Sequence, residues 1–121
     1  MLPCVTKTVV VVDDDPALLY LIEDALRLIG AEVQSFSSGV AAIEQADWSD
    51  VDAAVVDWMM PGMNGLEVLT WVEQHHPRVT CVMLTAAPDA LLGSHPEIRK
   101  RAAVIAKTDF PGGLYSALGL A

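Results

Sequence analysis

Apolar and polar residues divide this chain into two kinds of block, short apolar runs and longer stretches in which apolar residues recur every three or four positions. The short runs cover residues 7–12, 31–36, 52–57, 79–86 and 103–107. Their length and apolar character predict β-strands, most of them covered on both faces. Helical spacing covers residues 15–30, 38–46, 64–76, 95–102 and 110–120. The pattern therefore predicts five strands alternating with five helices.

Residues that favour helix ends mark several of these boundaries. Asp15 is a good N-cap, and Pro16 suits the first turn of the helix that Gly30 ends. Ser38 opens the second helix, and Pro77 stops the third. Regular alternation of strand and helix predicts an α/β fold, a doubly wound five-stranded parallel sheet with helices on both faces.

Polar residues stand at the carboxyl ends of four predicted strands. These residues are Asp13 and Asp14, Asp57, Thr85 and Lys107. In an open parallel sheet, ligands bind beyond the carboxyl ends of the strands, so we expect these side chains to meet at one edge. Three carboxylates that converge there would repel one another unless a cation is supplied, and Mg²⁺ favours one or two carboxylates, waters and a phosphate oxygen.

Each of these side chains has a role that its chemistry suits. Asp13 and Asp14 are interpreted as metal-holding groups, acting directly or through water. Asp57 is then a ligand and a potential nucleophile, because carboxylates form aspartyl-phosphate intermediates. Lys107 and Thr85 supply an ammonium and a hydroxyl that can hold phosphoryl oxygens.

In this order, the motifs resemble a known family. The acidic pair, the pattern D-x-x-M-P-x-x-x-G as "DWMMPGMNG" over residues 57–65, Thr85 with Ala86, and Lys107 together resemble the receiver domains of bacterial two-component response regulators, the CheY-like superfamily. The resemblance covers essentially the whole chain. It implies the flavodoxin-like strand order 2-1-3-4-5 and a single receiver domain over residues 1–121 with no output domain.

The resemblance also implies a function. Asp57 would accept a phosphoryl group from a sensor histidine kinase or a histidine phosphotransfer protein. Mg²⁺, or Mn²⁺ in its place, would be coordinated by the backbone carbonyl of Met59 with Asp14 and Asp57, while Asp13 helps mainly through water. The domain would be a signalling switch that catalyses only its own phosphorylation and dephosphorylation, acts on a downstream effector, and dimerises through the face of its fourth helix, fifth strand and fifth helix.

Two other readings of the same residues stay open. A degenerate pseudo-receiver would act as an interaction module whose conformation does not depend on phosphate. A Mg²⁺-dependent phosphohydrolase with an aspartyl nucleophile would need a further acid or base shortly after the nucleophile, and "DWMMPG" offers none.

The chain departs from the family pattern at two positions near Lys107. Thr108 follows the lysine where relatives usually have a proline in a cis peptide, and a cis bond before a residue other than proline costs roughly 2.5 to 4 kcal/mol. Val104 stands where relatives usually carry Tyr or Phe. The usual aromatic part of the switch is therefore missing, and the signal must leave by another route.

The segment after the fourth strand is expected to carry that signal. Gly93 and Pro96 interrupt the usual fourth helix, and Ser94 and Glu97 have the spacing of a capping box. We therefore expect the helix to begin near His95, leaving residues 86–93 as a mobile loop, with room for one helical turn, that reports phosphorylation.

Two side chains predict a long-lived phosphoryl group. Met59 and Ala87 occupy the positions that tune its lifetime in the family, and neither can orient an attacking water. Nearby, Arg99, Lys100 and Arg101 are interpreted either as a solvated helix end or as a surface for an acidic partner or self-association.

Composition limits the partners and the compartment. A formal charge of −9 over 121 residues argues against direct binding of nucleic acid, which needs a basic face. No apolar run is long enough to span a membrane, and the start of the chain lacks the pattern of a secretory signal, so we expect a cytoplasmic protein. Cys4 and Cys81 are expected to stay unpaired, and the adjacent His75 and His76 to suit the end of a helix rather than a metal site.

Overall fold

A computed structural model describes residues 7–119 of the chain. Its strands are β1 (Thr8–Val12), β2 (Glu32–Phe36), β3 (Ala53–Asp57), β4 (Thr80–Thr85) and β5 (Ala103–Ala106). All neighbouring strands are parallel, and their order is β2-β1-β3-β4-β5. The predicted fold class and strand order are confirmed.

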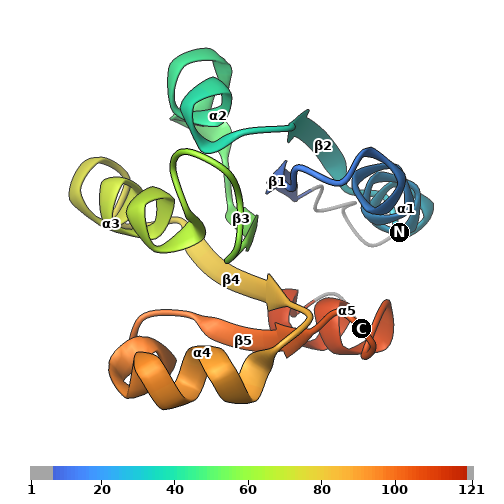
Figure 1. Cartoon of the computed structure of the whole chain (residues 1–121). Coiled ribbons are helices and arrows are strands. Elements are labelled where there is room, and N and C mark those ends of the chain that lie inside the picture. Colours follow the sequence, from blue (N-terminus) through green and yellow to red (C-terminus); the bar gives the residue numbers. More distant parts are fainter. Residues whose placement is uncertain (1–6, 120–121) are drawn as a thin grey trace.

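Helices cover both faces of this sheet. They are α1 (Pro16–Leu28), α2 (Gly39–Gln45), α3 (Gly65–His75), α4 (Pro88–Ser94) and α5 (Gly112–Leu118), with two short 3-10 segments, η1 (Trp48–Asp50) and η2 (Pro96–Lys100). In Figure 1, α1 and α5 lie on one side of the sheet, and α2, α3 and α4 lie on the other. The expectation of helices on both faces is confirmed.

Alternate residues of the central strands build two separate cores. Val9 and Val11 of β1 pack with Ile22 of α1 and the apolar residues of α5. Val10 and Val12 face the other way and pack with Val68 and the other buried residues of α2, α3 and α4. The four valines of β1 are at most 1% exposed, because side chains on both faces of the strand are covered. This double burial explains the continuous apolar runs.

The predicted helix starts follow from capping bonds. Asp15 Oδ1 accepts the backbone N–H of Ala17 at 3.0 Å, and Ser38 Oγ accepts that of Ala41 at 3.1 Å. Asn64 and Glu67 form a reciprocal capping box at the start of α3. These bonds satisfy backbone donors that a helix leaves free in its first turn.

The prediction for the segment after β4 is wrong. A helix, α4, begins at Pro88, so the expected loop over residues 86–93 is reduced to the two residues before it. The expected capping box does not form, because Ser94 Oγ bonds back to the carbonyl of Ala90 at 2.9 Å. Leu91 is fully buried and anchors the helix against the sheet, an interaction that local spacing does not reveal.

Beyond α4, the predicted helix over residues 95–102 is a 3-10 segment instead. Pro96 has no N–H and its ring clashes with the preceding turn, so α4 cannot continue through it. The N–H of Ile98 bonds to the carbonyl of His95 at 3.1 Å, a spacing of three residues. Ile98 is fully buried and holds η2 to the same core as α4.

The remaining boundaries and expectations need little correction. The last helix begins at Gly112, two residues later than predicted. Cys81 is buried and free, whereas Cys4 and the predicted helix end at Leu120 lie outside the described residues. Among the described helices, none has the length and apolar character needed to cross a membrane.

Candidate functional site

The register of the parallel strands brings the predicted site residues to one edge. Val12 of β1 pairs with Val56 of β3, so Asp13 and Asp57 are the next residues on adjacent strands. On the other side, Thr85 of β4 pairs with Ala106 of β5, and Lys107 follows directly. The expectation that the polar strand ends share an edge is confirmed.

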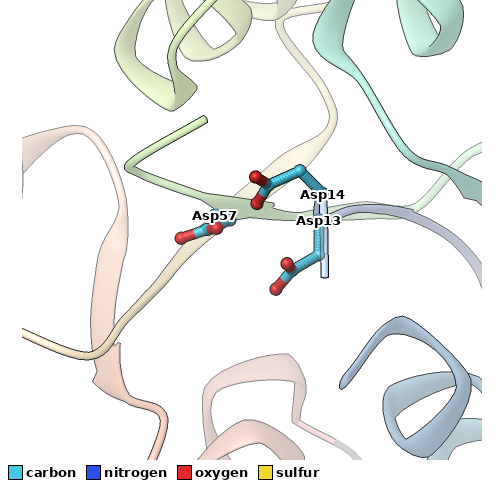
Figure 2. A group of neighbouring side chains, drawn as sticks. All are labelled: Asp13, Asp14 and Asp57. Carbon is cyan, nitrogen blue, oxygen red and sulfur yellow. The ribbon is translucent and has the colours of Figure 1, made fainter. Parts of the chain in front are cut away.

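Three carboxylates form a compact cluster at this edge. One oxygen from each of Asp13, Asp14 and Asp57 lies within 4.8 Å of the other two. Figure 2 shows Asp13 and Asp14 turning their carboxylates to the side on which Asp57 lies. Asp13 and Asp57 are 1% and 5% exposed, whereas Asp14 is exposed to solvent. Two of the three acids are therefore buried.

Lys107 compensates part of this charge. Its Nζ lies 3.3 Å from Oδ2 of Asp13 and 3.3 Å from Oδ2 of Asp57. Burial alone would lower the pKa of Lys107, but the two carboxylates outweigh it and raise the pKa above its ordinary value. One ammonium therefore serves two buried acids.

The charge of Lys107 does not restore the pKa of Asp57 to its ordinary value. Burial raises the pKa of Asp57 to about 6, and the neighbouring Asp13 carboxylate adds to the shift. Lys107 and the backbone N–H of Met59 oppose this rise without cancelling it. Asp57 is still mainly ionised at neutral pH, but the nearby ammonium of Lys107 does not offset its burial and the charge of Asp13.

Asp13 shows the same deficit in its hydrogen bonds. Its Oδ1 accepts the backbone N–H of Asp15 at 2.9 Å. Its buried Oδ2 has no aligned hydrogen-bond donor within residues 7–119, and Lys107 Nζ lies 3.3 Å from it. A buried carboxylate oxygen whose only nearby cation in this part of the chain is shared with Asp57, beside two further carboxylates, belongs to a ligand set that suits a hard divalent cation such as Mg²⁺.

Thr85 is positioned for a different task. Its side chain is buried, with 2% exposure, and its Oγ1 accepts the backbone N–H of Ala87 at 3.0 Å. Because a hydroxyl both accepts and donates, the proton of Thr85 remains for another acceptor. The backbone N–H of Lys107 donates to the Thr85 carbonyl at 2.8 Å and ties the ends of β4 and β5 together.

The loop after Asp57 is held by its glycines. The N–H of Gly65 donates to the carbonyl of Trp58 at 3.0 Å. A Cβ on Gly65 would clash with the carbonyl oxygen of Asp57 and stand 2.9 Å from Cα of Trp58. Gly62 has a φ of +76°, which other residues rarely adopt. The turn can therefore close tightly against the end of β3, and the Met59 side chain is left 68% exposed.

The departures from the family pattern have definite structures. The peptide between Lys107 and Thr108 is trans, since the cis peptide in residues 7–119 is Phe110–Pro111. The lysine nevertheless reaches both acids. Val104 pairs with Met83 and packs partly buried against the core of the α3 and α4 face.

The basic segment is smaller than the sequence suggested. Arg101 is engaged with Glu73 of α3, at 3.1 and 3.0 Å from its Nε and 2.6 Å from its Nη2. Its Nη2 also donates to Thr70 Oγ1 at 3.1 Å. Arg99 and Lys100 remain exposed. Arg101 thus joins η2 to α3.

Sequence reasoning missed one pair of side chains beside Asp57. The rings of Trp58 and His95 meet edge to face, with centroids 6.1 Å apart. The available signal was an aromatic residue directly after Asp57. Its partner is 37 positions away, by the numbering of Trp58 and His95, so no local pattern identifies it.

Comparison with known proteins agrees with the fold and identifies the family. The family model of the response regulator receiver domain matches residues 9–95. The chain therefore belongs to the response regulator receiver family, and it is a signalling switch of the kind that is phosphorylated on aspartate, as the sequence predicted.

Several relatives show the extent of the similarity. The probable transcriptional regulatory protein TcrX of Mycobacterium tuberculosis is 38% identical over 79 residues, which are 65% of this chain and 34% of TcrX. The DNA-binding transcriptional regulator NtrC of Escherichia coli is 35% identical over 79 residues, again 65% of this chain but 17% of NtrC. The matched region is thus a minor part of both relatives.

Solved structures match more of the chain. A CheY-like receiver domain protein from Methanospirillum hungatei is 26% identical, with a TM-score of 0.75 over 95% of both chains. The response regulator TrrA of Thermotoga maritima, solved in complex with Mg²⁺ and BeF, has a TM-score of 0.79 at 23% identity, over 95% of this chain and 99% of TrrA. The second likeness is one of fold.

Proposed function

We propose that Asp57 is the phosphoacceptor of this domain and that it takes its phosphoryl group from a phosphohistidine donor. The observation that carries the proposal is the shortage of positive charge at the edge of the sheet. Three carboxylates lie together, one lysine pairs with two of them, and within residues 7–119 a buried oxygen of Asp13 has no aligned hydrogen-bond donor. Such an arrangement costs stability unless a cation and a reaction use it.

The metal would be held by the acids that the structure brings together. Asp14 and Asp57 would coordinate Mg²⁺ or Mn²⁺ with the backbone carbonyl of Met59, and Asp13 would act mainly through water. The metal would neutralise the charge of the acids and of the incoming phosphoryl oxygens. The approach of the three carboxylates to within 4.8 Å supports this ligand set.

The protein's own residues supply the rest of the reaction. An ionised oxygen of Asp57 attacks phosphorus, a P–O bond forms, and the P–N bond to the donor imidazole breaks. Lys107, already at 3.3 Å from Asp57, would donate to a phosphoryl oxygen. Thr85 would donate a hydrogen bond to another phosphoryl oxygen, because its Oγ1 only accepts the N–H of Ala87 and its hydroxyl proton is left over. The donor imidazole leaves as a neutral ring when its other nitrogen already carries a proton, so this chain need not supply an acid for the transfer.

The phosphoryl group should persist for minutes or longer. The Met59 side chain is exposed beside the site but cannot orient water by hydrogen bonding, and Ala87 carries no polar group. Hydrolysis would therefore lack positioned assistance. This favours a switch over a phosphohydrolase.

The partners follow from this assignment. A sensor histidine kinase or a histidine phosphotransfer protein would be the donor, and a downstream effector would respond. We infer a cytoplasmic location and one receiver domain over residues 1–121. We also infer no direct contact with nucleic acid, because the chain is strongly acidic. A homodimer through α4, β5 and α5 is a further expectation from the family.

Intact mass measurement with a small phosphodonor tests the proposal. Wild-type protein incubated with acetyl phosphate and Mg²⁺ should gain one phosphoryl group, and Asp57→Asn should gain none. EDTA should prevent the gain, while Asp89→Asn, which changes an exposed acid of α4, should not. Absence of any gain in the wild type would favour the pseudo-receiver, and continuous release of phosphate would favour the phosphohydrolase.

A further inference from the structure

Trp58 connects the acceptor strand to a distant segment. It follows Asp57 directly, and its carbonyl is fixed by the N–H of Gly65 at 3.0 Å. Its half-buried ring meets the half-buried ring of His95 edge to face, at 78° and with centroids 6.1 Å apart. The ring that contacts His95 thus belongs to the residue directly after Asp57.

His95 lies at the joint between α4 and η2. Its N–H donates to the carbonyl of Leu91 in α4 at 2.8 Å, and its carbonyl accepts the N–H of Ile98 in η2 at 3.1 Å. Its Nδ1 lies 2.9 Å from Ser94 Oγ. Since these bonds belong to two different elements, a movement of His95 alters the angle at which η2 leaves α4.

The other end of α4 also depends on the acceptor site. Ala87 is the N-cap residue of α4 and provides no side-chain cap. Its N–H is bonded instead to Thr85 Oγ1 at 3.0 Å. Two residues next to the site thus hold α4, Thr85 at its start and Trp58 at its end.

We propose that the contact between Trp58 and His95 transmits the phosphorylation state of Asp57 to the joint between α4 and η2. The inference rests on the proposed function of Asp57. Val104 is partly buried against the core and has no ring to reorient, so the contact supplies an aromatic link where position 104 has none. An aromatic pair of this kind can bias two conformations by about 2- to 10-fold.

Hydrogen exchange measured by mass spectrometry tests the proposal in the full chain. Each protein is compared before and after treatment with acetyl phosphate and Mg²⁺, and intact mass reports how much of it is phosphorylated. In the wild type, we expect phosphorylation to change exchange in residues 85–87 and, by about 2- to 10-fold, in residues 95–102. In His95→Ala, the change at 85–87 should remain and the change at 95–102 should be lost.

The chain contains a matched control. His75 stacks on Trp71 with centroids 4.6 Å apart, so His75→Ala removes a similar contact from another part of the molecule. This variant should keep the wild-type response in residues 95–102. Trp58→Leu tests the same link from the opposite side and replaces His95→Ala if circular dichroism shows that the latter does not fold.

Each result decides the question. Phosphorylated His95→Ala with the wild-type response at 95–102 would overturn the proposal, and so would an equal loss in His75→Ala. A phosphorylated wild type without any response at 95–102 would overturn it while leaving the role of Asp57 intact. Failure of the wild type to gain a phosphoryl group would instead refute the proposed function, and the inference with it.

Discussion

The two ends of the parallel sheet differ in the side chains that gather there, acids at one end and aromatic rings at the other. At the carboxyl end, Asp13 and Asp57 are buried together and share one lysine. At the amino ends of β3 and β4, aromatic rings pack instead. Trp48 stacks on His76 with centroids 5.5 Å apart and meets Trp71 at 5.4 Å, beside a cleft of about 530 Å³.

Polar groups are also treated differently at the two ends. Trp48 Nε1 donates to the carbonyl of Ala42 at 3.1 Å, and His75 Nδ1 lies 2.8 Å from the carbonyl of Trp71. At the other end, Oδ2 of Asp13 has no aligned hydrogen-bond donor in the part of the chain that the structure describes. The fold thus concentrates satisfied contacts at the aromatic end and unsatisfied charge at the acidic end, so substitutions at the two ends should have opposite effects on stability.

The largest effect is expected at the aromatic end. Trp48→Ala should lower the free energy of unfolding by about 3 to 5 kcal/mol, because it removes a large side chain that is 7% exposed and leaves a cavity. Urea unfolding followed by circular dichroism measures the change. Mg²⁺ affinity of the folded variant should match the wild type, and a weakened affinity would show that the two ends are coupled.

A substitution at the acidic end should stabilise the protein. Asp57→Asn removes a buried charge, and without divalent cations it should raise the free energy of unfolding by about 2 to 3 kcal/mol at pH 7.5. The folded pKa is about 6 and lies above the unfolded value, so the folded state binds the proton more tightly. Wild-type stability should therefore fall as pH rises from about 4 to about 6, and remain lower above that range.

Measurement of unfolding against pH checks both the size and the sign. The gain from Asp57→Asn should shrink toward pH 4 and disappear at about pH 3, where the acid is protonated in both states. Asp50→Asn, at an exposed position of η1, is the control and should change stability little. A gain that stays constant down to pH 4 would contradict the electrostatic explanation.

Divalent cations should stabilise the folded protein by neutralising charge at the acidic end. Mg²⁺ at ten times its dissociation constant should raise the free energy of unfolding of the wild type by about 1.4 kcal/mol, because it binds the folded state. Thermal unfolding with Mg²⁺ or EDTA measures the shift. Asp14→Asn should show a smaller shift, since one of the three clustered carboxylates is gone. An equal shift in this variant would place the ion elsewhere.

The smallest effect is expected at a partly exposed ion pair, where Arg101 ties η2 to α3. Arg101→Met should lower the free energy of unfolding by about 0.5 to 1 kcal/mol, because the ion pair with Glu73 is partly exposed. A double-mutant cycle with Glu73→Gln isolates the pair. Phosphorylation by acetyl phosphate should be unchanged, and a lost phosphoryl group would mean that this pair supports the acidic site.

The sequence predicted the sheet and the acidic site well for a physical reason. Parallel strands end at one edge, so locating the strand ends was enough to bring Asp13, Asp57 and Lys107 together. The position of α4 could not be predicted in the same way. It depends on the burial of Leu91 and Ile98 in a core assembled from distant parts of the chain.

Contacts across long sequence separations were likewise not predictable. The pairing of Arg101 with Glu73 and that of Trp58 with His95 join segments whose positions are set by packing. The spacing of residues within either segment does not identify the distant partner. The basic segment at residues 99–101 consequently seemed to offer three free charges when one of them is engaged within the fold.

The position of Lys107, at 3.3 Å from both Asp13 and Asp57, makes the two acids competitors for one ammonium. A proton on Asp57 weakens its attraction and leaves the lysine to Asp13, whereas a phosphoryl group adds negative charge and draws the lysine toward Asp57. The position of Lys107 therefore depends on the relative charge of Asp13, after β1, and Asp57, at the end of β3. The position of Lys107 would change with the charge on Asp57. Its contact with Asp13, after β1, would change with it, even where the fold of the domain stays the same.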